Sequence, residues 1–286
     1  MNIMKMKKLL TVLLVAVLTV GCVFAFAACK KPPKYKVGAQ EGTTGALYLK
    51  GDADMNFGGF QNIESKTYDS IGQAVDDMLN GNINCVVGDI EPAKAVAALK
   101  AGKVKVIDVA LSTESYAIGV NKEDAQLLSS INATLAEMGE NGKLAEIIAN
   151  YNNENYDPEG VSAGTVDNTK SQLVVATNAD FKPFEYKKGD KFVGIDIEIA
   201  KYIADKLEME LVIKDMNFDS VVTSVGKNGV DIAMAGLTVK ESRKISVNFS
   251  DSYYTDSYQV LIVKADDTTF DGCTTKAEIE AKLKSL

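Results

Sequence analysis

The chain has 286 residues, with 31 basic and 39 acidic side chains, a formal net charge of −8 and no histidine. The acidic balance argues against a nucleic-acid groove, which needs a basic face. The absence of histidine excludes Ser-His and Cys-His catalysis and histidine-based zinc sites. A composition of 46% hydrophobic and 24% charged residues is that of an ordinary globular protein, long enough for one large domain or two smaller ones.

The first 28 residues have the pattern of an export signal. The basic segment MNIMKMKK precedes the apolar run LLTVLLVAVLTVGCVFAFAA, which ends in small residues. A transmembrane helix is the alternative, because about 20 apolar residues could span a bilayer. We expect a signal peptide over 1–28 and a short tether over 29–35.

The sequence FAAC, residues 26–29, resembles the lipobox of bacterial lipoproteins, in which the cysteine carries the lipid. Phe26 departs from the leucine-like residue usual at that position. TVGC, ending at Cys22, is a weaker second candidate. The expected lipid anchor is therefore Cys29.

Short β-rich runs alternate with helical runs through most of the remaining chain, and this order predicts an α/β fold with a mostly parallel sheet. The expected strands are 35–40, 84–89, 105–111, 173–178, 210–216, 231–236 and 258–265, and the expected helices are 70–81, 127–152 and 195–209.

Two cysteines lie beyond the signal region. Cys85 sits in the apolar run INCVV, an expected buried strand, and Cys273 sits in a turn-rich stretch. An exported protein could join them in a disulfide, but we expect two unpaired thiols.

A faint internal repeat suggests two similar lobes. YDSI (68–71) leads to NGNINCVVGD, and FDSV (218–221) leads to NGVDIAMAGLT. Each copy predicts a helix capped by Asp or Ser, an Asn-Gly stop, and a strand that ends at a glycine, Gly88 or Gly236. Because ligands of open α/β sheets bind beyond the carboxyl ends of strands, these glycines would face each other across a cleft. Coincidence between two ordinary helix–strand units is the alternative.

Three long blocks resemble bacterial polar amino-acid-binding proteins, the family 3 extracellular solute-binding subunits of amino-acid ABC importers. The runs LVVATNADFKPFEYKKGDKFVGIDIEIAKYIADKL and MNFDSVVTSVGKNGVDIAMAGLTVKESRKISVNFS resemble the first lobe of that family. YKVGAQEGTTGALYLK through NGNINCVVGDIEPAKAVAAL resembles the second lobe, and YAIGVNKEDAQLLSSINATLAEMGENGKLAEIIANY the closing segment. The resemblance implies a periplasmic-binding-protein-like type II fold, with two Rossmann-like lobes joined by a two-strand hinge.

The order of the blocks departs from the family. The second lobe comes first, the closing segment follows, and the first lobe comes last, so we expect a circular permutant; a truncated tandem fusion is the alternative. The C-terminal stretch resembles the segment that normally precedes residue 36. Close surface termini make permutation physically easy. The expected division is 36–111 and 268–286 for the second lobe, 112–155 and 172–267 for the first lobe, and 156–171 for the linker that joins the usual termini.

The resemblance assigns the first-lobe side of an amino-acid site. Arg243, the only arginine in the chain, matches the residue that pairs with the ligand α-carboxylate. A guanidinium makes two parallel hydrogen bonds to a carboxylate, whereas lysine offers a point charge on a flexible stem; an ordinary surface arginine is the alternative. Thr238, Ala235 and Gly236 match contacts to the α-groups of the ligand.

Two aromatic residues of the first lobe, Phe181 and Phe218, match residues that line the pocket and cover the ligand. Both could instead be ordinary core phenylalanines.

The second lobe supplies the other half of the site in this resemblance. Thr43 and Thr44 would complete the carboxylate site, where a helix N-terminus favours an anion; a plain Gly-Thr turn is the alternative. Asp89 matches the carboxylate that holds the α-ammonium, although an Asp in this position is as often a helix cap. A zwitterion that bridges Arg243 and Asp89 would favour the closed state.

Asn178 and Gln40 fall where family members read the ligand side chain, and both are neutral. A charged ligand side chain ordinarily requires an opposite charge, so we expect a polar uncharged amino acid. Glu41, Glu91 or Glu185 would favour a basic ligand if it pointed into the cleft.

The expected function is therefore a lipid-anchored, monomeric, extracytoplasmic receptor that delivers an amino acid to an ABC permease, with no cofactor, metal or nucleic-acid partner. Hinges are expected near Ser112–Tyr116 and Val263–Asp267, where closure would respond to ligand. Two rival functions stay open: a dehydratase-like enzyme on the same scaffold, and a ligand-sensing surface lipoprotein without a transport role.

Overall fold

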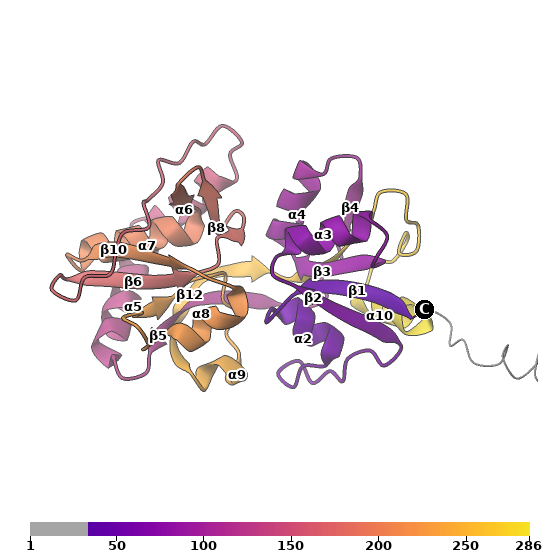
Figure 1. Cartoon of the computed structure of the whole chain (residues 1–286), viewed down its shortest axis with the longest axis horizontal. Coiled ribbons are helices and arrows are strands. Elements are labelled where there is room, and N and C mark those ends of the chain that lie inside the picture. The colour runs from indigo at the N-terminus through magenta and orange to yellow at the C-terminus, as the bar shows by residue number, and fades with distance from the viewer. Residues whose placement is uncertain (1–33) are drawn as a thin grey trace, which may run out of the picture. The chain divides into compact units, whose positions relative to one another are not determined.

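Two five-stranded sheets form the framework of residues 35–286, which make one compact unit in the computed structural model. The structure describes residues 34–286, so the expected signal peptide, Cys22 and Cys29 lie outside the described residues. Figure 1 shows helices packed around each sheet. None of the helices in the described part of the chain is long and apolar enough to cross a membrane.

The second lobe is built on the sheet with strand order β2-β1-β3-β13-β4. Its strands are β1 (Tyr35–Gln40), parallel to β2 (Ile63–Tyr68) and β3 (Cys85–Asp89), and β13 (Gln259–Lys264), antiparallel to β3 and β4 (Val104–Ile107). One face packs on α2 (Thr44–Lys50) and α10 (Lys276–Ser285), and the other on α3 (Ile71–Leu79) and α4 (Ile90–Leu99).

Alternation of side chains explains why the two faces of this sheet are both covered. Cys85 and Val87 join the core beneath α2 and α10, while Val86 between them joins the core beneath α3 and α4. Successive residues of a strand point to opposite faces. A continuous apolar run therefore buries both faces, as in doubly wound α/β sheets.

The first lobe repeats this plan with the strand order β10-β6-β11-β5-β12. Its strands are β6 (Gln172–Thr177), parallel to β10 (Glu210–Asp215) and β11 (Ile232–Ala233), and β5 (Glu114–Asn121), antiparallel to β11 and β12 (Val247–Ser257). Its helices are α5 (Ala125–Glu140), α6 (Lys143–Tyr151), α7 (Ile195–Lys206), α8 (Phe218–Ser224) and α9 (Glu241–Lys244), and a small sheet holds β7 (Asp180–Phe181), β8 (Glu185–Lys188) and β9 (Lys191–Val193). The predicted α/β fold is confirmed, but the expectation of mostly parallel sheet is wrong, because each five-stranded sheet has two parallel and two antiparallel pairings.

The chain crosses between the two sheets twice. One crossing, between β4 and β5, falls at the expected hinge near Ser112. The other lies at Tyr258, between β12 and β13, and not at Val263–Asp267. Because β13 pairs with β3 and β4, the assignment of all residues 172–267 to the first lobe is wrong for 259–264. The other domain boundaries stay predictions.

The repeated helix–strand unit is less regular than its sequence suggests. Ser70 caps α3, and its hydroxyl accepts a hydrogen bond from the N–H of Gln73 at 3.3 Å. In the second copy, α8 begins at Phe218 itself and ends at Ser224, before the Asn-Gly stop. The helix expected over 127–152 is two helices, because Gly142 takes a left-handed conformation (φ 77°) between α5 and α6.

The expected linker is docked on the first lobe. Val161 forms a β-bridge with Phe192, and the N–H of Ile213 donates to the carbonyl of Ala163 at 2.7 Å. The Tyr156 hydroxyl donates to Glu198 Oε1 at 2.7 Å. These contacts attach the segment 156–163 to the lobe at several points.

Both cysteines of the described residues are unpaired, as predicted. Cys85 is buried in β3, and Cys273 is half-buried.

Candidate functional site

The candidate site lies where strands of both sheets end. Gln40 and Asp89 are the last residues of β1 and β3, while Asn178 and the Ala235–Gly236 pair follow β6 and β11. This position beyond the carboxyl ends of parallel strands is where open α/β sheets bind ligands. Ten of the eleven residues named from the sequence are buried, and Arg243 is half-buried.

Asp89 occupies the N-cap position of α4, but its side chain makes no capping hydrogen bond. Instead, its Oδ2 accepts a hydrogen bond from the hydroxyl of Tyr116 at 2.5 Å. Ser257 lies 2.6 Å from that same hydroxyl, and because the phenol proton is committed to Asp89, Ser257 must donate. The simple capping interpretation is therefore insufficient for Asp89.

The electrostatic environment of Asp89 disfavours its charge. Burial, and then the nearby Glu114 carboxylate, raise the pKa of Asp89 well above its ordinary value. A cation placed beside Asp89 would oppose both effects, because an opposite charge favours the ionised carboxylate.

Arg243 spans the boundary between the lobes. Its Nη1 donates to the carbonyl of Thr238 in its own lobe at 2.8 Å, and its Nη2 donates to the carbonyl of Gly42 in the other lobe at 3.1 Å. The guanidinium lies 5.3 Å from the ring centroid of Phe218. Burial lowers the pKa of Arg243, but a guanidinium stays protonated in proteins.

Position 236 has no room for a side chain, so it requires glycine. Its φ is +54°, and a Cβ there would lie 2.6 Å from the ring of Phe181. Asp196 holds the segment, since its Oδ2 accepts hydrogen bonds from the N–H of Gly236 at 2.9 Å and from the hydroxyl of Tyr253 at 2.8 Å. Phe181 and Phe218 also belong to the two cores of the first lobe, so they combine core and site positions.

Gln40 and Asn178 meet across the lobe boundary. Gln40 Nε2 donates to Asn178 Oδ1 at 2.8 Å and to the carbonyl of Asp69 at 2.9 Å, while Asn178 Nδ2 donates to the carbonyl of Met216. The two amides thus form a neutral, buried hydrogen-bonded pair.

Thr43 and Thr44 differ in whether their hydroxyl groups are free to bind a ligand. The hydroxyl of Thr43 donates to the carbonyl of Gln40 at 2.7 Å and accepts from the N–H of Ala46 as the cap of α2. Thr44 Oγ1 is buried and has no hydrogen-bond partner among the described residues. Thr43 therefore fits the turn interpretation, whereas Thr44 keeps a hydroxyl proton to donate.

Glu114 is a buried residue of the site that sequence reasoning missed. It lies at the start of β5 and is 2% exposed. Its carboxylate accepts hydrogen bonds from Ser112 Oγ at 2.7 Å, Gln259 Nε2 at 2.9 Å and Thr238 Oγ1 at 2.7 Å. Glu114 thus connects both chain crossings to Thr238. The sequence signal that could have identified it was an acidic residue inside the expected hinge Ser112–Tyr116.

The three glutamates that bear on ligand charge lie in different places. Glu41 pairs with Lys50 at 3.5 Å, and Glu91 pairs with Lys94 at 3.1 Å. Glu185 is fully buried within the first lobe, and neither of its carboxylate oxygens has a hydrogen-bond donor among the described residues.

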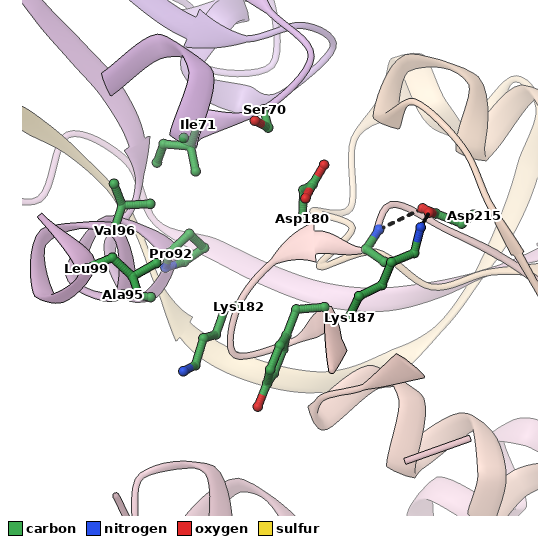
Figure 2. A pocket seen from close by; sticks show the side chains of 13 residues that line it. Ser70, Ile71, Pro92, Ala95, Val96, Leu99, Asp180, Lys182, Lys187 and Asp215 are labelled. Atoms are coloured by element: carbon green, nitrogen blue, oxygen red, sulfur yellow. Dashed lines mark hydrogen bonds and ion pairs between the residues drawn. The ribbon is translucent and has the colours of Figure 1, made fainter. Parts of the chain in front are cut away.

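A cavity of about 330 Å³ adjoins the site between the lobes. Figure 2 shows Ser70, Ile71 and four residues of α4 on one side, Pro92, Ala95, Val96 and Leu99, and on the other Asp180, Lys182, Lys187 and Asp215. Ile71 also lines the much smaller cavity beside Asp89 and Phe181, so the two spaces adjoin. Within residues 34–286, no group of three His, Cys, Asp or Glu side chains could hold a metal ion.

Comparison with known proteins gives the site a context. Residues 173–284 match the family described as bacterial extracellular solute-binding proteins, family 3. The chain is 41% identical to the arginine-binding extracellular protein ArtP of Bacillus subtilis (strain 168) over 105 residues, which are 37% of this chain and 41% of that protein. The chain thus spans less than half the length of this curated relative.

Two further matches mark the range of relatives. The arginine-bound form of domain 1 from TmArgBP is 32% identical, with a TM-score of 0.29, over 43% of this chain and all of that domain. Cyclohexadienyl dehydratase of Pseudomonas aeruginosa (strain PAO1) is 27% identical over 99 residues, which are 34% of this chain and 37% of that enzyme. Other curated relatives are named as a probable histidine-binding protein of Campylobacter jejuni, 30% identical over 40% of this chain and 43% of that protein, and a probable ABC transporter arginine-binding protein, ArtJ, of Chlamydia trachomatis, 32% identical over 27% of this chain and 30% of that protein.

Proposed function

Because residues 173–284 match the bacterial extracellular solute-binding proteins of family 3, we propose that the chain is a member of that family, captures a free α-amino acid between its lobes and delivers it to an ABC importer. The observation that carries the proposal is the placement of Asp89 and Arg243. One comes from each lobe: Asp89 ends β3, whereas Arg243 lies on α9 and already reaches across to the carbonyl of Gly42. A zwitterion has the two charges that these residues complement.

The α-carboxylate would pair with Arg243 and with the unpartnered hydroxyl of Thr44. Charge-assisted hydrogen bonds of this kind are roughly twice as strong as neutral ones. The α-ammonium would pair with Asp89. Thr238 would accept from it, since the hydroxyl proton of Thr238 is donated to Glu114. The aromatic rings of Phe181 and Phe218 would cover the ligand.

The ligand side chain, we propose, is polar and uncharged. The neutral Gln40–Asn178 pair supports this, as do the lysine partners of Glu41 and Glu91. The adjoining 330 Å³ cavity past Ile71 would accommodate an extended side chain. A cationic side chain, as in the ligand named for ArtP, is the competing case.

A binding role is favoured over catalysis. A dehydratase relative exists, but the amino-acid-reading set of this chain is complete and the chain has no histidine. The proposal places the protein outside the cytoplasm as a monomer, tethered through a lipid on Cys29.

Circular permutation is part of the proposal. Asn62 Nδ2 donates to the carbonyl of Leu283 at 2.7 Å, and the next residue, Ile63, pairs with Tyr35 in the sheet. The end of α10 therefore lies beside the start of β1 (Figure 1). This proximity supports the idea that residue 286 takes the place of the segment that precedes β1 in the usual order.

The test is thermal unfolding of residues 30–286 with each of the twenty amino acids. A ligand at a hundred times its Kd stabilises a protein by roughly 2.7 kcal/mol. One or a few uncharged polar amino acids should raise the Tm, and Arg243→Lys should abolish the shift. A shift with arginine or lysine alone would overturn the side-chain assignment. A folded protein that responds to none would overturn the binding function, and turnover of candidate substrates would then be measured.

A further inference from the structure

A second set of contacts joins the lobes outside the amino-acid site. Lys240 Nζ lies 2.5 Å from Asp52 Oδ2, and the two side chains are 4% and 6% exposed. The N–H of Glu241 donates to Asp54 Oδ2 at 3.1 Å. Among ion pairs between described residues, only Lys240–Asp52 has both side chains less than a tenth exposed. Lys240 and Glu241 belong to the first lobe, whereas the two aspartates follow α2 in the second.

Asp52 is fixed at the neck of a tight loop. Its backbone exchanges two hydrogen bonds with Phe57, at 2.8 and 3.0 Å, and its Oδ1 accepts from the N–H of Asp54 at 3.0 Å. The Phe57 ring stacks on Tyr48 of α2 at 5.0 Å. The carboxylate of Asp52 is therefore held ready by its own lobe.

Lys240 is fixed equally well on the other side. It is the N-cap residue of α9, and its carbonyl accepts from the N–H groups of Arg243 and Lys244, both at 3.0 Å. The preceding residue, Val239, donates its N–H to the carbonyl of Ser115 on β5 at 3.3 Å. Lys240 thus moves with Arg243, three residues further on. Figure 1 shows α2 and α9 in the lower half of the same view.

We propose that Lys240 and Asp52 form an interlobe latch that positions Arg243 against the second lobe and slows ligand release. The latch rests on the proposed function, but it includes no residue that would contact the amino acid. A buried charge without a partner is expensive. In the arrangement in which the lobes touch, each charge is compensated by the other, so loss of either residue would leave its partner buried and unpaired and would destabilise that arrangement.

A double-mutant cycle tests the latch. Asp52→Asn, Lys240→Met and the double variant are compared with the wild type for Kd and for the dissociation rate of the amino acid that stabilises the protein. Each single variant should weaken binding at least about tenfold, mostly through faster dissociation, because truncating one member of a buried pair acts on the off-rate. The double variant should cost less than the product of the two single effects.

The matched control is Lys244→Met on the same helix. Lys244 pairs with Glu241, with side chains 46% and 76% exposed, and its loss should leave Kd and the off-rate unchanged. Equal effects of Lys240→Met and Lys244→Met, or strictly multiplicative single effects, would overturn the latch while leaving the amino-acid site intact.

A readout without ligand keeps the latch distinct from the proposed function. By small-angle scattering, ligand-free Lys240→Met should have a larger radius of gyration than the wild type, and Lys244→Met should not. If no amino acid binds but this difference appears, the proposed function fails and the latch stands. Identical radii for all three proteins would overturn the latch.

Discussion

Tyr116 donates a hydrogen bond to Asp89 at 2.5 Å although the two residues belong to sheets of different lobes. Tyr116 lies on β5 directly after a chain crossing, so the carboxylate of the second lobe is oriented by the hinge region itself. In the proposed function, this contact would link recognition of the ligand α-ammonium to the geometry of the chain crossing.

Replacing Tyr116 with Phe removes the hydroxyl that donates to Asp89 and leaves the Ser257 hydroxyl without its partner. We expect a Kd about tenfold higher for the stabilising amino acid, because a lost hydrogen bond to a carboxylate costs about 1.5 kcal/mol. Isothermal titration calorimetry would measure this change. Tyr254→Phe is the matched control, since that ring stacks on Tyr116 at 5.7 Å and its hydroxyl makes no hydrogen bond with the described residues. An unchanged Kd in Tyr116→Phe would contradict the orienting role.

The free energy of unfolding should fall as pH rises above 4.5 because of Glu185. Burial, together with the neighbouring Asp196 carboxylate, raises the pKa of Glu185 well above its ordinary 4.5, and burial raises the pKa of Asp196 to about 6. The folded protein then holds a proton that the unfolded chain has lost. The free energy of unfolding should therefore decrease by about 1.4 kcal/mol per pH unit for this one group above pH 4.5, up to its raised pKa.

Urea unfolding between pH 5 and pH 8 would measure that slope. Glu185→Gln keeps a neutral side chain with donors toward Asp196, so the slope should flatten by about one proton. Glu154→Gln, at an exposed position just after α6, is the control. A Glu185→Gln protein with the wild-type slope would show that Glu185 is not the protonated group.

Thr43 and Thr44 should separate stability from affinity. Thr43→Ala removes the cap of α2 and should lower the free energy of unfolding by about 1 kcal/mol. Thr44→Val removes a buried hydroxyl with no partner, so stability should hold or rise while Kd increases several-fold. Chemical unfolding and calorimetry on both variants would decide. An equal loss of stability in both would assign Thr44 to the turn alone.

The reordered chain tests the permutation. A protein with residues 172–286 first and 35–155 after them should fold, unfold cooperatively and bind the same amino acid with a similar Kd. Because the linker contacts of Tyr156 and Val161 would be lost, a lower Tm is expected. Failure of the reordered chain to fold, with the natural order intact, would count against the permuted arrangement.

Sequence patterns predicted most of the parallel strands, and best those with continuous apolar runs, but they missed the more polar parallel strand β2. The runs NCVVGD and LVVATN became β3 and β6 nearly to the residue. The edge strand β12 escaped prediction: its sequence, VNFSDSYYTDS, is polar, and its pairing with β5 is interrupted by register shifts. Only tertiary pairing makes such a segment a strand.

Part of the candidate site could also be predicted from sequence motifs. Asp89 and Arg243 stand out by motif, and the structure places Asp89 at the end of β3 and Arg243 on α9, in contact with Gly42 of the other lobe. Glu114 and Tyr116 could not be assigned from sequence because their roles depend on where the chain crosses between sheets. The Lys240–Asp52 pair joins residues 188 positions apart, so no local pattern could predict it.

The strand order of the second lobe has a consequence for biogenesis. β13 lies between β3 and β4, yet it follows them by more than 150 positions in the chain. A chain that emerges from its N-terminus would therefore start this sheet first and complete it last. Until β13 arrives, β3 and β4 each expose an unpaired edge, which invites association with other chains. The first-lobe sheet is completed by β12, which ends at Ser257 directly before β13 begins at Gln259, so both sheets close at nearly the same point of synthesis.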